Sequence, residues 1–294
     1  MSFPVSPMKA TLGTMPHSQD DWAFEIKWDG YRTLAHIGGS RLRLQSSNSL
    51  DVTAKYPELV DFPAHVNAQN AILDGELVVL NSAGRPSFEL MQQHATDVAF
   101  YVFDVLHIDG HDTIGLAYES RRALLENLVE PGSHWMVPAF RIGAGTELLQ
   151  ATADMQLEGV MAKRLGSPYL VGRRSTSWVK LKNRRTVEVT IGGYDLGSGA
   201  RAASFGALLV GSPAADGTLV FAGSVGTGFT QQTLDSLGAR LKELRISESP
   251  FSTQIPASYR KGAFWVSPTL RAKLEIAEFT NEGYVRHASF ISLA

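Results

Sequence analysis

Lys27 is the first residue of this chain whose surroundings suggest chemistry. It lies in the stretch FEIKWDGYR, residues 24–32, between Ile26 and Trp28. A lysine in an apolar strand is costly unless its charge or its amine is used. After losing its proton a lysine is a nucleophile, and burial or neighbouring cations favour that loss. We therefore predict a reactive lysine within a strand, followed by the turn pair Asp29-Gly30.

A basic stretch could supply the neighbouring cations. Residues 163–185, KRLGSPYLVGRRSTSWVKLKNRR, hold eight Lys or Arg and no Asp or Glu. A solvated basic face is one interpretation. Tyr169 and Trp178 are interleaved with the cations, which favours an anion-binding surface.

The segment WVKLK within this stretch alternates in polarity. Alternation places Lys180 and Lys182 on one face of a strand and Val179 and Leu181 on the other. Two ammonium groups on one face repel each other unless an anion lies between them. A phosphate would be such an anion.

Two carboxylates adjoin predicted strands and are candidate metal ligands. Glu76 lies in LDGELVVL and Glu158 in LEGVMAKR. A divalent cation held there would promote loss of a proton from a nearby lysine. The alternative for each glutamate is a solvated residue at a strand end.

These residues need a scaffold of strands and helices. The predicted strands are AFEIKW, TLAHI, RLRLQS, AILDGELVVL, AFYVFDVLHI, EGVMAKR and SWVKLK. Helical spacing predicts YESRRALLENLV, with an apolar stripe of Leu124, Leu125, Leu128 and Val129. A second helix, GTELLQATADMQ, is predicted with Thr146 as N-cap and with Leu148, Leu149, Thr152 and Met155 at helical spacing.

The composition changes after about residue 185. The stretch from residue 187 is rich in Gly and β-forming residues with closely spaced turns, which predicts a small antiparallel barrel. One helix, TQQTLDSLGARLKEL, interrupts it, and helical spacing places Leu234, Leu237, Leu241 and Leu244 on one face of it. We predict an α+β chain with one domain over residues 1–185 and a second over 186–294.

Bulk properties exclude several classes. The chain has no cysteine, which excludes disulfides and thiolate metal sites. The net charge of −2 argues against a generally basic nucleic-acid binder but not against a local basic surface. No apolar run is long enough to span a membrane, and the first 21 residues lack a secretory pattern. We expect a cytoplasmic protein without a membrane segment.

The motifs become specific to one protein family when their order along the chain is considered. KWDGYR, LDGEL, FYVFDVL, LEGVMAKR and SWVKLK resemble the successive nucleotidyltransferase motifs of ATP-dependent DNA ligases. YPEL, GRRSTSW, FGALLVG and VGTGF resemble the bacterial branch, the ligase modules of end-joining repair and their stand-alone relatives. The resemblance runs from about Pro7 to Phe290. It implies a nucleotidyltransferase (adenylation) domain of antiparallel sheets and helices, followed by an OB-fold barrel.

The resemblance implies roles for single residues. Lys27 matches the nucleophile that attacks the α-phosphorus of ATP, and Glu158 matches the carboxylate near the metal and the reacting phosphate. Phe103 matches the aromatic residue that stacks on adenine. The positions that match nucleotide-binding residues are Glu25, Ile26, Arg32, Glu76, Phe103, Lys180 and Lys182, and Glu76 is also a candidate metal ligand.

The resemblance further implies ATP and Mg²⁺ (or Mn²⁺) as requirements and nicked duplex DNA as the substrate of a monomeric, nucleoid-associated bacterial enzyme. End-joining repair proteins are expected partners. The residues expected to contact DNA are Arg43, Ser47, Arg173, Arg174, Arg184 and Arg185.

Two departures from the family pattern stand out. Where the family has Ser-Arg-Asn, this chain has Ser46-Ser47-Asn48, and a serine cannot supply the charged fork of an arginine. Relatives also continue past RHASF into a further basic motif, whereas this sequence stops at ISLA. We expect both departures to slow the reaction, with Arg41 or Arg43 as candidates to compensate for Ser47.

Two alternatives remain at this point. An RNA ligase or an mRNA-capping guanylyltransferase shares the lysine motif and the barrel, and a preference for GTP would identify the capping class. A nick-binding module that no longer ligates would retain DNA affinity without forming a covalent lysine–AMP.

Overall fold

The chain divides into two compact units, Met1–Asn183 and Arg184–Ala294. The computed structural model describes residues 3–93, 97–197, 199, 204–280 and 282–294. No helix in these ranges is both long and apolar enough to cross a membrane. The boundary expected after residue 185 lies close to this division, and strand β12 begins there, at Arg185.

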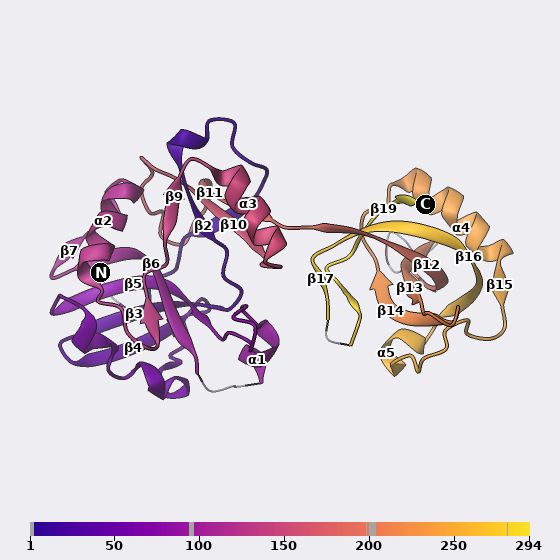
Figure 1. Cartoon of the computed structure of the whole chain (residues 1–294), viewed down its shortest axis with the longest axis horizontal. Coiled ribbons are helices and arrows are strands. Elements are labelled where there is room, and N and C mark those ends of the chain that lie inside the picture. Colours follow the sequence, from indigo (N-terminus) through magenta and orange to yellow (C-terminus); the bar gives the residue numbers. More distant parts are fainter. Residues whose placement is uncertain (1–2, 94–96, 198, 200–203, 281) are drawn as a thin grey trace. The chain divides into compact units, whose positions relative to one another are not determined.

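The first unit contains two sheets (Figure 1). In order, the first consists of β1 (Lys9–Leu12), β11 (Arg174–Lys182), β10 (Gly159–Arg164), β2 (Trp22–Ile26) and β9 (Phe140–Ile142). The second consists of β4 (Arg41–Ser46), β3 (Tyr31–Gly38), β5 (Asn70–Val78), β6 (Ala99–Ile108) and β7 (His111–Asp112), with β8 (Trp135–Met136) beside β6. The pairs β1–β11 and β6–β8 are parallel and the others antiparallel, which confirms the expected antiparallel character.

In residues 3–93 and 97–183, the described part of this unit, there are three α-helices: α1 (Phe88–Gln92), α2 (Tyr118–Leu128) and α3 (Gly145–Asp154). Four short 3₁₀ segments accompany them, at Gln19–Asp21, Thr53–Lys55, Pro57–Leu59 and Phe62–His65. Each predicted strand of this unit is present. One expectation was wrong in detail, because β2 ends at Ile26 and Lys27 lies just beyond the strand. The nucleophile candidate therefore occupies a loop that is anchored at a strand end.

The predicted stripe of α2 is only partly buried. Leu125, Leu128 and Val129 pack in the main core, whereas Leu124 is 40% exposed. Tyr118, Arg121 and Arg122 are buried in its place, so the inner face of α2 carries polar groups as well as apolar ones.

The predicted N-cap of α3 was wrong. Ala144 occupies that position, and the first two amides of the helix, those of Gly145 and Thr146, donate to Oε1 of Gln19 at 2.6 and 3.2 Å. The cap thus comes from a residue far away in the sequence. Met155, which was expected on the inner face, is 57% exposed.

One apolar cluster of the first unit includes strands of both sheets. Leu34 of β3 and Phe103 of β6 pack with Trp178 of β11, together with Met8 and Tyr169. Tyr169 and Trp178 are 2% and 0% exposed. The two aromatic residues are therefore interior, so this part of the basic stretch is not a solvated face.

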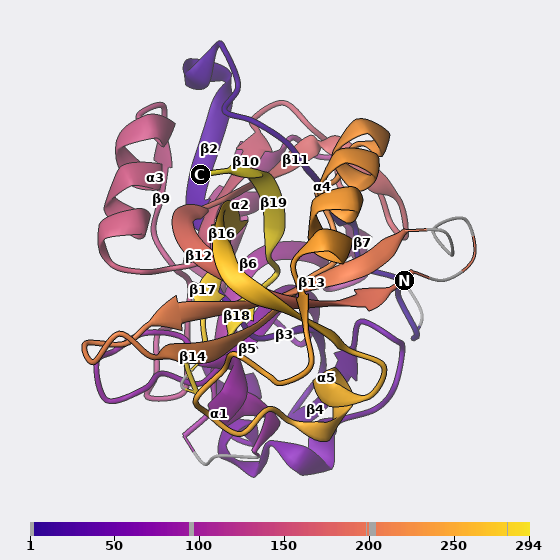
Figure 2. The same ribbon diagram turned by 90° about the vertical axis from the view of Figure 1, so that its right-hand side faces the viewer.

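The second unit is built on a six-stranded antiparallel sheet (Figure 2). Its order is β14 (Leu219–Val225), β13 (Phe205–Pro213), β12 (Arg185–Leu196), β16 (Phe264–Ile276) and β15 (Arg245–Ile246), with β19 (Ser289–Leu293) also paired to β16. The hairpin β17 (Glu278–Phe279) and β18 (Val285–Arg286) and the short helix α5 (Ala257–Arg260) complete it. Helix α4 (Gln231–Glu243) packs Leu234, Leu237 and Leu241 into the core, as predicted.

Candidate active site

A cavity of about 320 Å³ in the first unit holds most of the predicted nucleotide-binding residues. This volume lies within the range of small-ligand pockets. Strands of both sheets contribute to its wall, because β1, β2, β10 and β11 supply one side and β3, β5 and β6 the other. The lining residues are Pro7, Met8, Lys9, Ala10, Glu25, Ile26, Lys27, Trp28, Arg32, Ser47, Glu76, Phe103, Met161, Lys163, Arg174, Trp178 and Lys180.

The backbone around Lys27 is fixed by close approaches between strands. The amide of Lys27 donates to the carbonyl of Gly159 at 2.9 Å. A side chain at Gly159 would meet the carbonyl oxygen of Leu181 at 2.0 Å, and one at Gly30 would meet that of Leu77 at 1.9 Å. Both motif glycines are therefore required by packing around Lys27.

Lys27 is held by a carboxylate that a second lysine also contacts. Its ammonium group forms an ion pair with Glu158, and Lys182 reaches the other oxygen of Glu158 at 2.8 Å. Burial alone would raise the pKa of Glu158, but the charge of Lys27 and the hydrogen bonds from both lysines lower it on balance. Glu158 is therefore ionised at neutral pH and partly balances the positive charge of this part of the site.

The positive charges of several neighbouring side chains act on Lys180. Burial lowers the pKa of Lys180, and the charges of Lys27, Lys182 and Arg174 lower it further. Such a cluster is poorly balanced by Glu158 alone, so an anion bound among these groups would be stabilised. The structure thus brings together the two lysines that were expected to share a strand face, although Lys182 is not among the cavity-lining residues.

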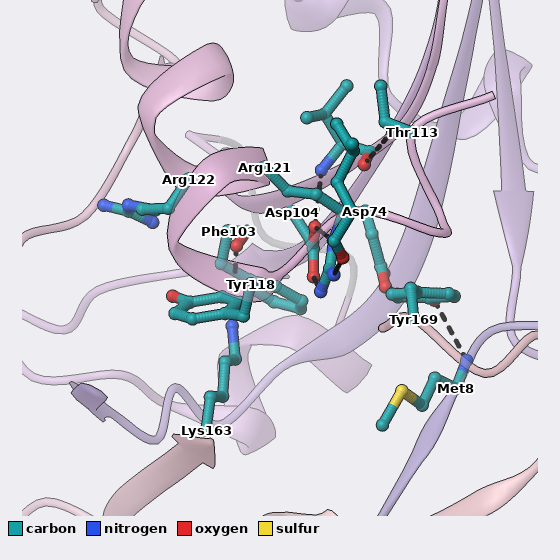
Figure 3. A network of polar contacts seen from close by, with 12 residues as sticks. Met8, Asp74, Phe103, Asp104, Thr113, Tyr118, Arg121, Arg122, Lys163 and Tyr169 are labelled. Atoms are coloured by element: carbon teal, nitrogen blue, oxygen red, sulfur yellow. Dashed lines mark hydrogen bonds and ion pairs between the residues drawn. The ribbon is translucent and has the colours of Figure 1, made fainter. Parts of the chain in front are cut away.

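Arg32 is aimed by a fully buried carboxylate. Asp74, which is 0% exposed, accepts hydrogen bonds from Nε and Nη2 of Arg32, both at 2.5 Å. The hydroxyl of Tyr169 also donates to Asp74 and accepts from the amide of Met8 (Figure 3). Burial would lower the pKa of Arg32, but the Asp74 carboxylate raises it on balance. The guanidinium lies 4.7 Å from the centre of the Phe103 ring, at the cavity wall.

Glu76 is the other carboxylate of the predicted set. It lines the cavity, and no hydrogen bond or ion pair joins its carboxylate to another of the described residues. Burial raises the pKa of Glu76 to about 7, against the opposing effect of the positive charges on Arg32 and Lys27. Its charge therefore changes near neutral pH.

Sequence reasoning missed a buried polar cluster beside Glu25. Lys163, which is 1% exposed, forms an ion pair with Glu25 at 2.7 Å. The hydroxyl of Tyr118 donates to the same carboxylate, and Arg122 lies 3.9 Å from it. Figure 3 shows Lys163 pointing toward Tyr118 and the main-chain carbonyl of Phe103. A signal existed, because alternation along EGVMAKR places Met161 and Lys163 on one face of β10.

Two tryptophans also line the cavity with unpaired donors. The indole nitrogens of Trp28 and Trp178 are buried and have no hydrogen-bond partner among the described residues. A buried polar group is costly when it is left unpaired, so a bound ligand or water that accepts from these donors would be stabilised.

The structure places the predicted DNA-contact residues in different surroundings. Ser47 and Arg174 line the cavity, and Nη1 of Arg174 donates to the carbonyl of Ala10 at 2.5 Å. Arg43 does not line it, since its guanidinium pairs with Asp51 at 2.9 Å and lies 3.5 Å from the Phe3 ring centre.

All five arginines of this set are exposed. Arg173 belongs to the first unit, whereas Arg184 and Arg185 belong to the second. Arg184 forms an ion pair with Glu275 of its own unit.

The carboxylates of the site offer few ligands for a divalent metal. Among the described residues, no group of three or more His, Asp or Glu side chains could hold a metal ion. Mg²⁺ commonly binds through one or two carboxylates, with waters and substrate phosphates completing its shell. The unpaired Glu76 fits that pattern. Glu158 fits it only after exchanging one of its lysine partners.

Comparisons with known proteins identify the family of the chain. Residues 5–182 match the ATP dependent DNA ligase domain, and residues 201–294 match the ATP dependent DNA ligase C terminal region. The chain is 42% identical over 292 residues to the multifunctional non-homologous end joining DNA repair protein LigD of Mycobacterium tuberculosis, covering 98% of this chain and 38% of that protein. It is 36% identical over 301 residues to LigD of Pseudomonas aeruginosa, covering 98% of this chain and 35% of that protein. The chain thus spans less than half the length of these relatives.

Solved structures give the same result. The ligase domain of M. tuberculosis LigD has a TM-score of 0.59 and 41% identity, with 100% of this chain and 96% of that chain covered. A mycobacterial DNA ligase D complexed with ATP and MES has a TM-score of 0.60 and 40% identity, with the same coverage. The family fold, an adenylation domain followed by an OB-like β domain, is therefore confirmed. This chain belongs to the ATP-dependent DNA ligase family.

Proposed function

We propose that this chain seals nicks in duplex DNA through a covalent lysine–AMP intermediate formed at Lys27. The observation that carries the proposal is the position of Lys27 in a cavity whose wall combines cations with buried aromatic residues. Phe103 and Trp178 offer flat apolar surfaces for a base, while Lys180 and Arg174 suit phosphates.

The proposed first step joins Lys27 to AMP. The Lys27 amine, after losing a proton, forms a bond from Nζ to the α-phosphorus of ATP, and the bond from that phosphorus to the pyrophosphate oxygen breaks. Glu158 keeps the amine in place before reaction, and the ammonium groups of Lys180 and Lys182 stabilise the negative charge that develops on the phosphate. The lysine–Glu158 ion pair must separate before the amine can attack.

The later steps transfer AMP to DNA. The 5′-phosphate at a nick attacks the lysine-bound AMP and releases Lys27, and the neighbouring 3′-hydroxyl then displaces AMP to form the phosphodiester. We place Arg32 and Glu76 on the nucleotide and Ser47 toward the DNA phosphate. Ser47 lines the cavity but carries no charge, so we expect it to bind that phosphate more weakly than an arginine would.

A divalent cation, Mg²⁺ or Mn²⁺, fits Glu76 and, after lysine exchange, Glu158. When bound, it would neutralise phosphate charge and help an amine lose its proton. Because the carboxylates are few, we propose that the ion binds together with the nucleotide.

We further propose a role in bacterial end-joining repair, with nicked duplex DNA as substrate and end-joining proteins as partners. This rests on the names of relatives that are longer than this chain. Such a substrate would place the protein at the bacterial nucleoid, in the cytoplasm. We propose that it acts there as a monomer.

The testing experiment incubates the protein with ATP labelled at its α-phosphate and Mg²⁺, followed by denaturing electrophoresis. We expect a covalent label that Lys27→Ala and Lys27→Arg abolish, since arginine keeps the charge but is not a nucleophile. The control Lys55→Ala, at an exposed lysine of the same unit, should label normally. Undiminished label in Lys27→Ala would refute the assignment. Preferential labelling by GTP would indicate capping chemistry, and labelling without nick sealing would indicate a degenerate ligase.

A further inference from the structure

Lys9 lines the cavity and has no role in the reaction described above. It is the first residue of β1 and is exposed, and its main-chain amide donates to the carbonyl of Arg173 at 2.8 Å. Among the residues that the structure describes, no hydrogen bond or ion pair engages its ammonium group. Four other cations of the wall are engaged: Lys27 with Glu158, Arg32 with Asp74, Lys163 with Glu25 and Arg174 with the carbonyl of Ala10. A ligand could therefore use Lys9 without displacing a protein partner.

The register of β1 and β11 places Lys9 beside a second cation. The two strands are parallel, and Lys9 is paired with Arg174. Paired residues of neighbouring strands have their side chains on the same face of the sheet, where like charges directly opposite each other are destabilising. An anion bound between the two groups would remove that repulsion. A phosphate suits both, because lysine and arginine each donate charged hydrogen bonds to its oxygens.

Arg32 connects this part of the wall with Ser47. Nη2 of Arg32 donates to the carbonyl of Met8 at 3.4 Å, and the amide of Ser47 donates to the carbonyl of Arg32 at 3.2 Å. Lys9 directly follows Met8 in the chain. Lys9 and Ser47 thus come from different sheets of the unit, adjoin the same arginine and line the same cavity.

The two arginines that were expected to compensate for Ser47 do not line the cavity. Arg43 is paired with Asp51. Arg41 begins β4, six residues before Ser47, which along a strand is a separation of about 20 Å. Of these three cations, Lys9 is the one that lies in the cavity wall.

We propose that Lys9 is a phosphate-binding residue, which holds a ligand phosphate between its ammonium group and Arg174 in the part of the wall that Arg32 connects to Ser47. This rests on the proposed function, which brings two kinds of phosphate to the cavity. The phosphate is either a terminal phosphate of ATP or the 5′-phosphate at a nick. In both cases Lys9 supplies a positive charge that Ser47 lacks.

Two single-turnover rates distinguish the two sources of phosphate. The first is covalent labelling by ATP at a subsaturating concentration. The second is transfer of AMP from the pre-labelled protein to a nick that carries a 5′-phosphate, with no ATP present. We expect Lys9→Met to lower one of these rates roughly five- to tenfold, an effect between that of an exposed ion pair and that of a buried charged hydrogen bond. Slower labelling assigns the contact to ATP, and slower transfer assigns it to the nick.

Two further variants test whether the charge of Lys9 is what matters. Lys9→Arg keeps the charge and should react at nearly the rate of the unaltered protein. Ser47→Arg introduced into Lys9→Met should restore the lost rate, because it returns a positive charge to the same part of the wall. The control Lys55→Met makes the same change at an exposed lysine of this unit and should lower neither rate.

Unchanged rates in Lys9→Met would overturn the proposal. A loss of rate that neither arginine substitution prevents would also overturn it, since that pattern indicates a structural role. Failure of ATP to label the unaltered protein would instead refute the proposed function.

Discussion

Glu76 and Glu158 show how two carboxylates near one reactive lysine can differ. Glu158 accepts from Lys27 and Lys182, which lower its pKa, whereas burial raises the pKa of the unpaired Glu76 to about 7. One carboxylate is therefore constantly charged near neutral pH, and the other gains its charge only as pH rises through about 7. This difference between the two pKa values suits a site in which Glu158 restrains Lys27 and Glu76 is available to bind a cation.

The titration of Glu76 gives a pH prediction. Below pH 7 the Glu76 carboxyl is protonated and is a weaker ligand for a metal, and above it the carboxylate is present. We expect the labelling rate of the unaltered protein, divided by that of Glu76→Gln, to rise between about pH 6 and pH 8 and then level off. Taking the ratio cancels the ionisation of Lys27, which both proteins share. A ratio that stays flat over this interval would mean that the charge of Glu76 is not used.

Helix α3 begins at an N-terminal cap that the side chain of Gln19 supplies. Because both capped amides depend on one side-chain oxygen, Gln19→Ala should expose Gly145 and Thr146 to exchange with solvent. A lost N-cap costs about 0.5–2 kcal/mol, so we expect those two amides to exchange roughly two- to thirtyfold faster. Gln150→Ala, on the exposed side of the same helix, is the matched control. Unchanged protection in Gln19→Ala would show that the cap contributes nothing.

The elements also show what the sequence could reveal. The strands of the site were predictable because alternation and turn residues are local signals, and the motif order placed Lys27, Glu76, Phe103 and Lys180 in one cavity. The cap of α3 was not predictable, since a local candidate, Thr146, was available while the true acceptor lies more than a hundred residues away. Partners that meet only in the folded chain leave no local pattern.

Burial of polar groups was the other weakness of sequence reasoning. The basic stretch suggested a uniform surface, but the structure divides it. Lys163 and Trp178 are buried in the cavity wall, Lys180 is half-buried in the same wall, and Arg173 is exposed. Composition cannot distinguish the buried cations of the stretch from the exposed ones, because a buried lysine is recognisable only when its counter-ion is known. Here that counter-ion, Glu25, lies on the neighbouring strand β2.

For the whole molecule, exposed arginines occur on both units. Arg173 in the first unit and Arg185 in the second are exposed, and neither has an ion-pair partner among the described residues. Arg174 and Arg184 are already engaged, with the Ala10 carbonyl and with Glu275. If duplex DNA contacts both units, the unengaged pair should contribute most, because no protein partner has to be given up.

This yields a prediction for DNA binding. Each phosphate contact adds about 0.9 to the slope of log affinity against log salt, so replacing Arg173 and Arg185 by alanine should reduce the slope by about 1.8. Affinity for a nicked duplex is measured at several salt concentrations, with Lys55→Ala as the control for removal of an exposed charge. Each single variant should lose about half of the effect, because the two residues belong to different units and should act independently. A slope that changes in only one single variant would assign the contact to that unit. A slope unchanged in the double variant would mean that these arginines are a solvated surface and that the phosphates are held elsewhere.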